Sequence, residues 1–323
     1  MDAVLVTGGA GYVGSHTVKL LRERGIPCVI LDNLVHGHRE FACGAPLIEA
    51  DVGDAAALDA LFARQRIAAV MHFAAYAYVG ESVGAPLKYF RNNVAATVTL
   101  LDRMVSAGIH RFIFSSSCAT YGIPNQVPIA EDHPQRPVNP YGASKVMVER
   151  MLADLDAAHD LKSIALRYFN AAGADPDGTI GERHDPETHL IPLALRAAMD
   201  PQQPLHVFGT DYPTPDGTCV RDYIHVRDIA EAHVLALQAL LEGGASDAFN
   251  LGNGSGYSVR EVVRTVESIA KRPVPVAEAP RRPGDPPILV GSSEKARRVL
   301  GWSPRFDRLE AIVETAWRWH RRG

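Results

Sequence analysis

The fold of this chain is decided near its N-terminus by the stretch Val4-Leu5-Val6-Thr7-Gly8-Gly9-Ala10-Gly11-Tyr12-Val13-Gly14. The apolar run Val4–Val6 predicts a short strand, and the amphipathic residues up to about Arg24 predict a helix. Between them, Gly8, Gly11 and Gly14 allow a tight turn and let the backbone approach a pyrophosphate at the helix N-terminus. Glycines alone would indicate only a tight turn, but the flanking strand and helix favour a dinucleotide site.

A second strand, Cys28–Leu31, ends in Asp32, about 20 residues after the glycines. A carboxylate there accepts hydrogen bonds from the ribose diol of adenosine and repels a 2′-phosphate, so NAD is favoured over NADP. The alternative is a strand-end acid that only faces solvent, which the preceding glycines disfavour.

Strands and helices continue to alternate through the first half of the chain. Further strands are expected at Pro46–Ala50, Ala69–Phe73, Arg111–Phe114 and Ser163–Arg167, and helices at Ala55–Arg64 and Pro86–Ala107. This pattern predicts an α/β fold with a doubly wound parallel sheet of the Rossmann type, whose ligands bind beyond the strand carboxyl ends. The candidate ligand residues fall at such ends, namely Gly8, Asp32, Asp51, Ala74 and Ser117.

The alternation breaks in the Gly-, Pro-, Asp- and His-rich segment 175–192. We therefore expect an NAD-binding domain at 1–172 and a smaller mixed α/β substrate domain at 173–323, with part of 219–243 packing back onto the first. No metal site is predicted. The Asp-Pro-Asp-Gly sequence lacks the third acidic ligand of a calcium loop, and the histidines at 36, 38, 184 and 189 supply only a His-x-His.

The stretch Asn139–Lys145 carries the candidate chemistry. Asn139 and Pro140 predict a helix start, after which Tyr141 and Lys145 lie one turn apart on one face. A nearby ammonium favours the phenolate form of a tyrosine, which can then accept a proton from a sugar hydroxyl. The pair alone is a weak signal, because a Tyr and a Lys on a solvated helix face are common.

Bulk composition excludes several classes of protein. The formal net charge is −4 over 323 residues, with no basic run typical of a nucleic-acid surface. The four cysteines form no Cys-x-x-Cys pair, which is typical of a reduced intracellular chain. The N-terminal residues lead us to expect no signal peptide, and no apolar run approaches about 18 residues. We expect a cytoplasmic protein that binds neither membrane nor nucleic acid.

Taken together, the motifs resemble the extended short-chain dehydrogenase/reductase superfamily, and within it the UDP-glucose 4-epimerase family, over nearly the whole chain. The superfamily motifs are the three glycines, Asp32-Asn33, Phe73-Ala74-Ala75, Ser115-Ser116-Ser117 and Tyr141-x-x-x-Lys145. More specific to the epimerases are Val207-Phe208-Gly209-Thr210-Asp211-Tyr212-Pro213-Thr214-Pro215-Asp216-Gly217-Thr218, Val220-Arg221-Asp222-Tyr223-Ile224-His225-Val226 and Arg281-Arg282-Pro283-Gly284-Asp285.

The resemblance implies an isomerase of galactose metabolism that interconverts UDP-galactose and UDP-glucose through a 4-keto intermediate. Tyr141 would remove the proton from the sugar O4 while the C4 hydride passes to tightly bound NAD, with Lys145 and Ser117 assisting. The implied cofactor contacts are Gly8, Gly11, Tyr12, Val13, Gly14, Asp32, Asn33, Asp51, Val52, Phe73, Ala74, Ala75, Asn92, Ser115, Tyr141, Lys145 and Phe169. The implied substrate contacts are Ser117, Tyr141, Asn170, His189, Leu190, Phe208, Arg221, Arg282, Asp285 and Leu289. A homodimer through the helices at Pro86–Ala107 and Tyr141–His159 is also implied.

The chain departs from the family pattern at three positions. Ala77 stands where some members have a phosphate-contacting Lys, with Tyr76 or Tyr78 as possible replacements. Leu289 stands where strict UDP-galactose enzymes tend to have Tyr, and His189 where Asn is common.

Because Leu289 leaves room beside the sugar C2, a 4-epimerase of UDP-N-acetylhexosamines remains an alternative, as does one of UDP-pentoses. A dehydratase is disfavoured because Cys118 and Ala119, and no carboxylates, follow Ser117. A non-catalytic NAD-binding protein is disfavoured by the intact Ser117, Tyr141 and Lys145.

Overall fold

The computed structural model describes residues 2–282 and 284–322. Met1, Pro283 and Gly323 belong to the predicted domains, and Pro283 also to the predicted nucleotide-binding stretch, but they lie outside the described residues.

A seven-stranded sheet forms the centre of the larger region, in the order β11-β6-β5-β4-β1-β2-β3 with every neighbouring pair parallel. Strand order reverses between β1 and β4, which confirms the predicted doubly wound sheet. The strands are β1 (Ala3–Thr7), β2 (Cys28–Asp32), β3 (Leu47–Glu49), β4 (Ile67–His72), β5 (Arg111–Ser115), β6 (Lys162–Tyr168) and β11 (Asp247–Leu251).

Strand β11 was not anticipated from the sequence. Its residues Asp-Ala-Phe-Asn-Leu show no clear strand pattern, and it forms through parallel pairing with β6. The helix before it, α8 (Val226–Leu241), packs against α1 (Tyr12–Glu23). Segment 226–251 therefore returns to the first sheet.

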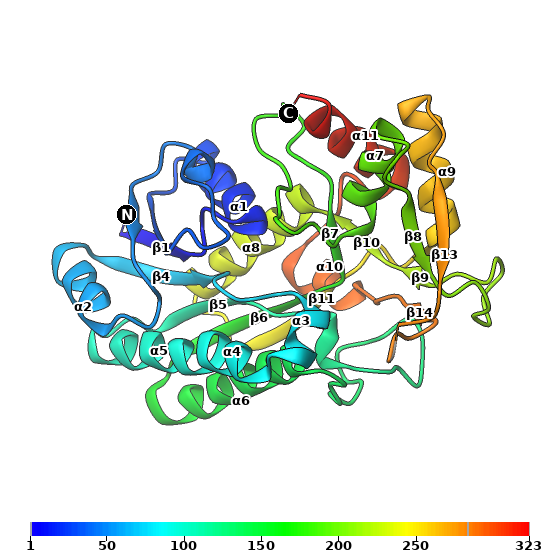
Figure 1. Ribbon diagram of the computed structural model, residues 1–323. Coiled ribbons are helices and arrows are strands. Elements are labelled where there is room, and N and C mark those ends of the chain that lie inside the picture. The colour runs from blue at the N-terminus through cyan, green and yellow to red at the C-terminus, as the bar shows by residue number, and fades with distance from the viewer. Residues whose placement is uncertain (1, 283, 323) are drawn as a thin grey trace.

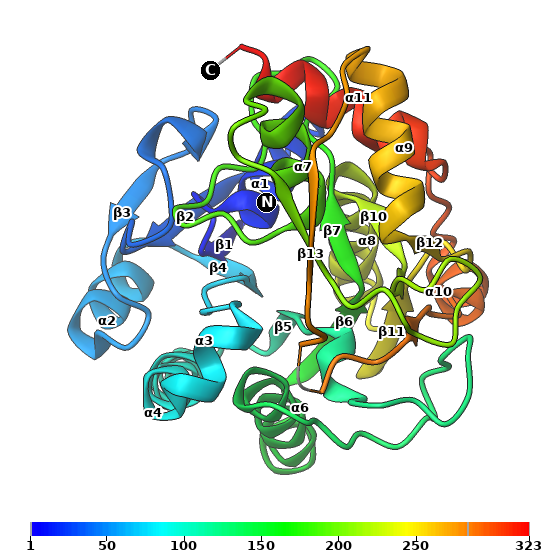
Figure 2. The same ribbon diagram turned by 45° about the vertical axis from the view of Figure 1, so that its right-hand side comes forward.

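Helices cover both faces of this sheet (Figures 1 and 2). One face packs on α1 and α8, and the other on α2 (Ala55–Arg64), α5 (Ala96–Ser106) and α6 (Pro140–His159). Side chains alternate along β1, where Val4 and Val6 join the first apolar cluster and Leu5 the second. The period of two for β-strand side chains thus produces one core on each face.

The second region consists of small sheets beside three helices. Its pairs are β10-β7, β12-β9-β14 and β13-β8, and α7, α9 and α11 cluster at one end of the molecule (Figure 1). The elements are β7 (Asn170–Ala172), α7 (Leu190–Met199), β8 (Leu205–Phe208), β9 (Val220–Arg221), β10 (Tyr223–His225), β12 (Tyr257–Ser258), α9 (Val259–Ala270), β13 (Val276–Ala279), β14 (Ile288–Leu289), α10 (Glu294–Leu300) and α11 (Leu309–His320). Within the described ranges, no helix combines the length and apolar character needed to cross a membrane.

Helix ends follow the capping signals in the sequence. The Asn139 side chain accepts a hydrogen bond from Gly142 N at 2.8 Å, and Pro140 opens α6. In α9, Ser258 and Glu261 form a capping box. The single helix expected at Pro86–Ala107 instead consists of α4 (Pro86–Tyr89), a π-helical turn η2 (Phe90–Ala95) and α5. The remaining short elements are α3 (Val79–Gly84) and the 3₁₀ turns η1 (Arg39–Ala42) and η3 (Cys118–Thr120).

Candidate active site

The glycine turn between β1 and α1 has two kinds of glycine. Gly8 has φ +71°, and a Cβ there would lie 2.6 Å from the Ala74 nitrogen, while a Cβ on Gly14 would lie 2.2 Å from the Gly8 oxygen. The protein itself therefore requires glycine at both positions. A Cβ on Gly11 would meet only the Gly8 oxygen, at 3.4 Å. The open space at Gly11, in front of the N-terminus of α1, fits the close approach of a dinucleotide diphosphate.

A cleft opens beyond the carboxyl ends of the central strands. The predicted cofactor residues that line it are Gly8, Gly11, Asp32, Asn33, Asp51, Val52, Phe73, Ala74, Ala75 and Asn92. His36, Gly37 and Tyr76 also line it. The other predicted cofactor residues are Tyr12, Val13, Gly14, Ser115, Tyr141, Lys145 and Phe169, which do not belong to this lining among the described residues.

Asp32 is held at the end of β2 by backbone amides. Its carboxylate accepts hydrogen bonds from Ala10 N at 3.0 Å and Leu34 N at 2.9 Å. A Cβ on Gly37 would lie 2.6 Å from an Asp32 oxygen, so the loop closes tightly over this side chain. Asp51 accepts a hydrogen bond from the Asn33 side chain at 2.9 Å. The two carboxylates thus have defined positions in a cleft that fits the adenosine end of NAD.

The candidate catalytic residues gather at the end of β5. Tyr141 is 9% exposed and Lys145 3%, so both are buried. The Lys145 ammonium donates to the Ser115 carbonyl at 2.8 Å and lies 4.9 Å from the Phe114 ring centre and 5.7 Å from that of Tyr141. Ser117 is the second residue after this strand and caps η3 by accepting a 3.2 Å hydrogen bond from Ala119 N.

Burial controls the ionisation of this pair. It raises the pKa of Tyr141 above its ordinary value, with a smaller contribution from Tyr168, while a hydrogen bond with Ser117 acts in the opposite direction. The sequence led us to expect the reverse direction from Lys145. That ammonium is bonded to Ser115, and burial lowers the pKa of Lys145 to about 7 despite the neighbouring Glu149 carboxylate. Desolvation therefore outweighs the proximity of the two side chains.

A buried ion pair that the sequence analysis missed supports the end of β5. Arg167 bonds both oxygens of Glu149, and the Ser116 hydroxyl donates to the same carboxylate at 2.5 Å. Glu149 lies one helical turn after Lys145 in α6, so the spacing of four from Tyr141 through Lys145 could have indicated it. Ser115 and Tyr168 share a 2.5 Å hydrogen bond next to this pair.

The π-helical turn η2 brings a buried amide to the cofactor loop. Asn93 accepts from Tyr76 N at 2.9 Å and donates to Tyr76 O at 3.0 Å and to the Ser144 hydroxyl at 3.2 Å. It therefore joins the Tyr76 loop to α6. In the sequence, Asn93 falls inside the helix expected at Pro86–Ala107, and nothing there signals this role.

Several of the predicted substrate residues meet on the small sheet of β9 and β14. Arg221 pairs with Asp285 at 2.5 Å, and Leu289 lies opposite Arg221 in the register of the two strands. The Arg282 guanidinium lies 4.0 Å above the Phe208 ring. Burial raises the pKa of the Cys118 thiol to about 12, and the Arg221 charge opposes this shift.

The remaining predicted substrate residues lie on neighbouring elements. Asn170 in β7 donates to the Asp222 carbonyl at 3.0 Å. Phe169, predicted beside the cofactor, packs so tightly on Gly291 that a Cβ there would lie 2.2 Å from its ring. Leu190 opens α7 and His189 precedes it, with the His189 imidazole against the Glu182 carboxylate.

Comparison with known proteins agrees with this geometry. The model of the NAD dependent epimerase/dehydratase family matches residues 4–252, which span the glycine turn, the Tyr141–Lys145 pair and the sheet through β11. The chain belongs to this family.

Three relatives of this family member illustrate the similarity. A UDP-glucose 4-epimerase of Rhizobium leguminosarum bv. trifolii is 53% identical over 99% of this chain and 97% of its own. One of Azospirillum brasilense is 54% identical over 98% of this chain and 92% of its own. The crystal structure of UDP-glucose 4-epimerase from Brucella ovis in complex with NAD is 50% identical, with a TM-score of 0.96 over 98% of each chain. The predicted resemblance and fold are confirmed.

Proposed function

We propose that this family member is a UDP-glucose 4-epimerase that interconverts UDP-galactose and UDP-glucose and keeps NAD bound through the reaction. The observation that carries the proposal is the buried Tyr141–Lys145 pair beside the β5 end, in a chain 53% identical to a UDP-glucose 4-epimerase over 99% of its length. The open position at Gly11 and the amide-held Asp32 fit the cofactor.

In this proposal Tyr141 accepts the proton of the sugar O4, and later returns it, as general base and acid. Ser117 holds the O4 hydroxyl in line with Tyr141. NAD, held near Gly11 and Asp32, would supply the hydride-transfer chemistry at the sugar C4. Because burial raises the pKa of Tyr141, we propose that the Lys145 ammonium stabilises the phenolate as it forms.

The UDP part is bound, in the same proposal, by the second region. Guanidinium groups bind phosphate oxygens bidentately, and Arg221 and Arg282 are the candidates for this role. Phe208 and Asp285, which contact these two arginines, orient them. The region 1–172 then binds NAD and 173–323 the nucleotide, which leaves the hexose free to turn between them.

A second candidate function follows from Leu289. Its side chain is partly buried beside Arg221, and it is smaller than the Tyr expected in strict UDP-galactose enzymes. The additional space supports the acceptance of UDP-N-acetylhexosamines alongside UDP-galactose.

The proposal includes a cytoplasmic homodimer. Four free cysteines are compatible with a reducing compartment. Large apolar side chains are exposed on the predicted pairing helices and beside them, with Val83 65%, Leu87 63%, Val98 47% and Met147 45% exposed. Large exposed apolar side chains on these helices support an interface there.

The experiment that tests the function is NMR of purified protein incubated with UDP-galactose and no added NAD. Conversion to an equilibrium mixture with UDP-glucose would support both the reaction and the retained cofactor. Absence of conversion, even after NAD is supplied, would reject the proposed activity. Repeating the experiment with UDP-N-acetylgalactosamine tests the second candidate.

A further inference from the structure

The loop between β7 and α7 gathers a set of potential metal ligands, of which only His189 was expected to contact the substrate. One donor atom from each of its four members lies within 4.8 Å of the others. We refer to these residues as the His/Glu cluster, which consists of Glu182, His184, Glu187 and His189. The sequence spacing is Glu-x-His-x-x-Glu-x-His, although the histidines alone had suggested no metal site.

The two carboxylates of the cluster are buried. The side chains of Glu182 and Glu187 are 3% and 0% exposed. Glu187 Oε2 is buried and has no hydrogen-bond partner among the described residues. An unsatisfied buried acceptor is costly, so this carboxylate oxygen indicates that a partner is missing from the cluster.

The distances within the cluster favour a small ion. His184 Nδ1 lies 3.2 Å from Glu182 Oε1 and 3.7 Å from Glu187 Oε1, and His189 Nδ1 contacts Glu182 Oε1 directly. Ligands about 2.0–2.2 Å from a tetrahedral ion are roughly 3.3–3.6 Å from one another. The four donor atoms lie within 4.8 Å of one another, which is the range of spacing that such an ion needs.

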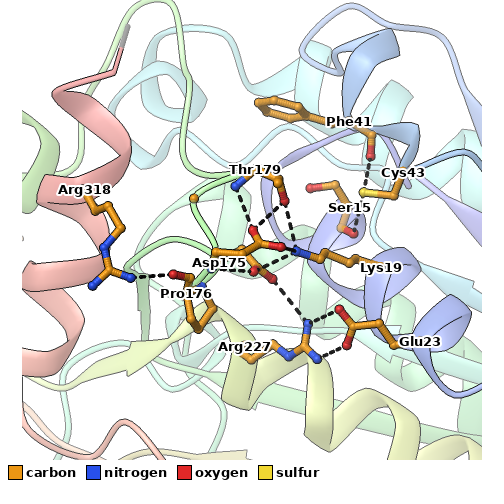
Figure 3. A network of polar contacts seen from close by, with 12 residues as sticks. Ser15, Lys19, Glu23, Phe41, Cys43, Asp175, Pro176, Thr179, Arg227 and Arg318 are labelled. Atoms are coloured by element: carbon orange, nitrogen blue, oxygen red, sulfur yellow. Dashed lines mark hydrogen bonds and ion pairs between the residues drawn. The ribbon is translucent and has the colours of Figure 1, made fainter.

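Ion pairs and hydrogen bonds to several other elements hold the loop that carries the cluster. Asp175, near its start, lies between Lys19 of α1 at 2.8 Å and Arg227 of α8 at 3.3 Å (Figure 3). Further along, Trp319 Nε1 donates to the Glu182 carbonyl at 2.9 Å, and the Arg183 carbonyl contacts His38 at 2.9 Å. A loop fixed in this way loses little further freedom when a ligand binds.

We propose that the His/Glu cluster is a binding site for a divalent transition metal ion, with Zn²⁺ as the best match. Two imidazole nitrogens and two carboxylate oxygens are donors that zinc accepts in four-coordinate sites, whereas Ca²⁺ and Mg²⁺ prefer oxygen ligands alone. Four protein ligands make a closed, structural site. His184 packs against Tyr12 and Tyr78, with ring centres 6.0 Å and 6.1 Å away, so the ion would brace the loop against the glycine-turn helix.

Zinc binding is measured on untagged protein that has been treated with a chelator and then titrated with Zn²⁺ by calorimetry. We expect about one Zn²⁺ per chain, with Mg²⁺ giving no binding. Glu187→Gln and His184→Asn should each weaken Zn²⁺ binding by about tenfold or more. The matched controls Glu242→Gln and His159→Asn, at exposed positions elsewhere, should bind as the unaltered protein does.

Zinc K-edge X-ray absorption of the unaltered protein tests the ligands without any variant. Two imidazoles and oxygen ligands support the proposal, whereas sulfur ligands, or a failure to bind Zn²⁺, overturn it. Equal affinity in the cluster variants and the controls also overturns it, and leaves the cluster as a set of ion pairs. Metal content is measured without sugar, so its outcome is independent of the proposed epimerase activity.

Discussion

At the scale of single residues, Tyr141 is the side chain on which the proposed chemistry depends. Replacement by Phe removes the hydroxyl but keeps the ring in its buried site. We expect Tyr141→Phe to lower turnover of UDP-galactose by about 10²-fold or more. Bound NAD, measured after release from the denatured protein, should remain at the unaltered level. Turnover at the normal rate would contradict the proposed role.

The lowered pKa of Lys145 predicts how the free energy of unfolding depends on pH. Its pKa is lowered to about 7 by burial, below the unfolded value near 10.4, so the unfolded chain binds more protons between these two values. The Lys145 contribution to the free energy of unfolding therefore rises with pH in that window, by about 2 kcal/mol from pH 7 to pH 9. This change is measured by urea unfolding of the unaltered protein and of Lys145→Met, both free of NAD, at pH 7 and at pH 9.

The comparison must be made between the two proteins, because another group titrates in the same range. Burial alone would lower the pKa of His184, but the Glu182 and Glu187 carboxylates raise it to about 9. That contribution is common to both proteins and cancels in their difference. An equal pH dependence in the two proteins would show that Lys145 stays charged in the fold.

Leu289 tests the sugar specificity. Leu289→Tyr should lower conversion of UDP-N-acetylgalactosamine by about tenfold or more and leave that of UDP-galactose nearly unchanged, because the larger ring occupies space needed only by the N-acetyl group. The two rates are measured by NMR on the same preparation. An equal loss of both rates would refute the argument from pocket size.

At the scale of elements, the glycines of the turn from β1 to α1 have different roles. Gly8 and Gly14 are needed for folding, whereas Gly11 leaves space for a ligand. Gly14→Ala places a Cβ 2.2 Å from the Gly8 oxygen and should destabilise the fold by about 3 kcal/mol. Gly11→Ala meets only an ordinary contact and should cost less than about 1 kcal/mol.

The effect on NAD affinity should be specific to Gly11→Ala, the variant with the smaller effect on stability. Gly11→Ala should weaken NAD binding by about tenfold or more, because its methyl group occupies the position proposed for the diphosphate. Urea unfolding and NAD titration of both variants test the pair. Normal NAD affinity in Gly11→Ala would place the diphosphate elsewhere.

At the scale of the whole molecule, the exposed apolar side chains on the helices from α3 to α6 predict a homodimer. Val98→Asp and Met147→Asp should each shift the protein towards monomer, since a buried unpaired carboxylate is strongly unfavourable in an interface. Light scattering after size-exclusion chromatography measures the mass. Val299→Asp, at a 54% exposed position on α10, is the control that should leave the mass unchanged. A monomeric unaltered protein would reject the proposed dimer.

Features that depend on neighbours along the chain were determined by the sequence. The glycine turn, the alternation of strand and helix, the Asn139 cap of α6 and the single-turn spacing of Tyr141 and Lys145 all follow from interactions within a few residues. The capping box at Ser258 and the start of α8 after His225 depend on local interactions of the same kind.

Only the tertiary structure decided the features that join distant segments. Strand β11 exists through its pairing with β6, and Glu149 meets Arg167 across the end of the sheet. The fold also set the direction of the Tyr141 pKa, because desolvation depends on everything that packs around a group. The fold of one loop also buries two carboxylates and brings His184 and His189 next to them. Residue spacing alone does not specify how that loop folds.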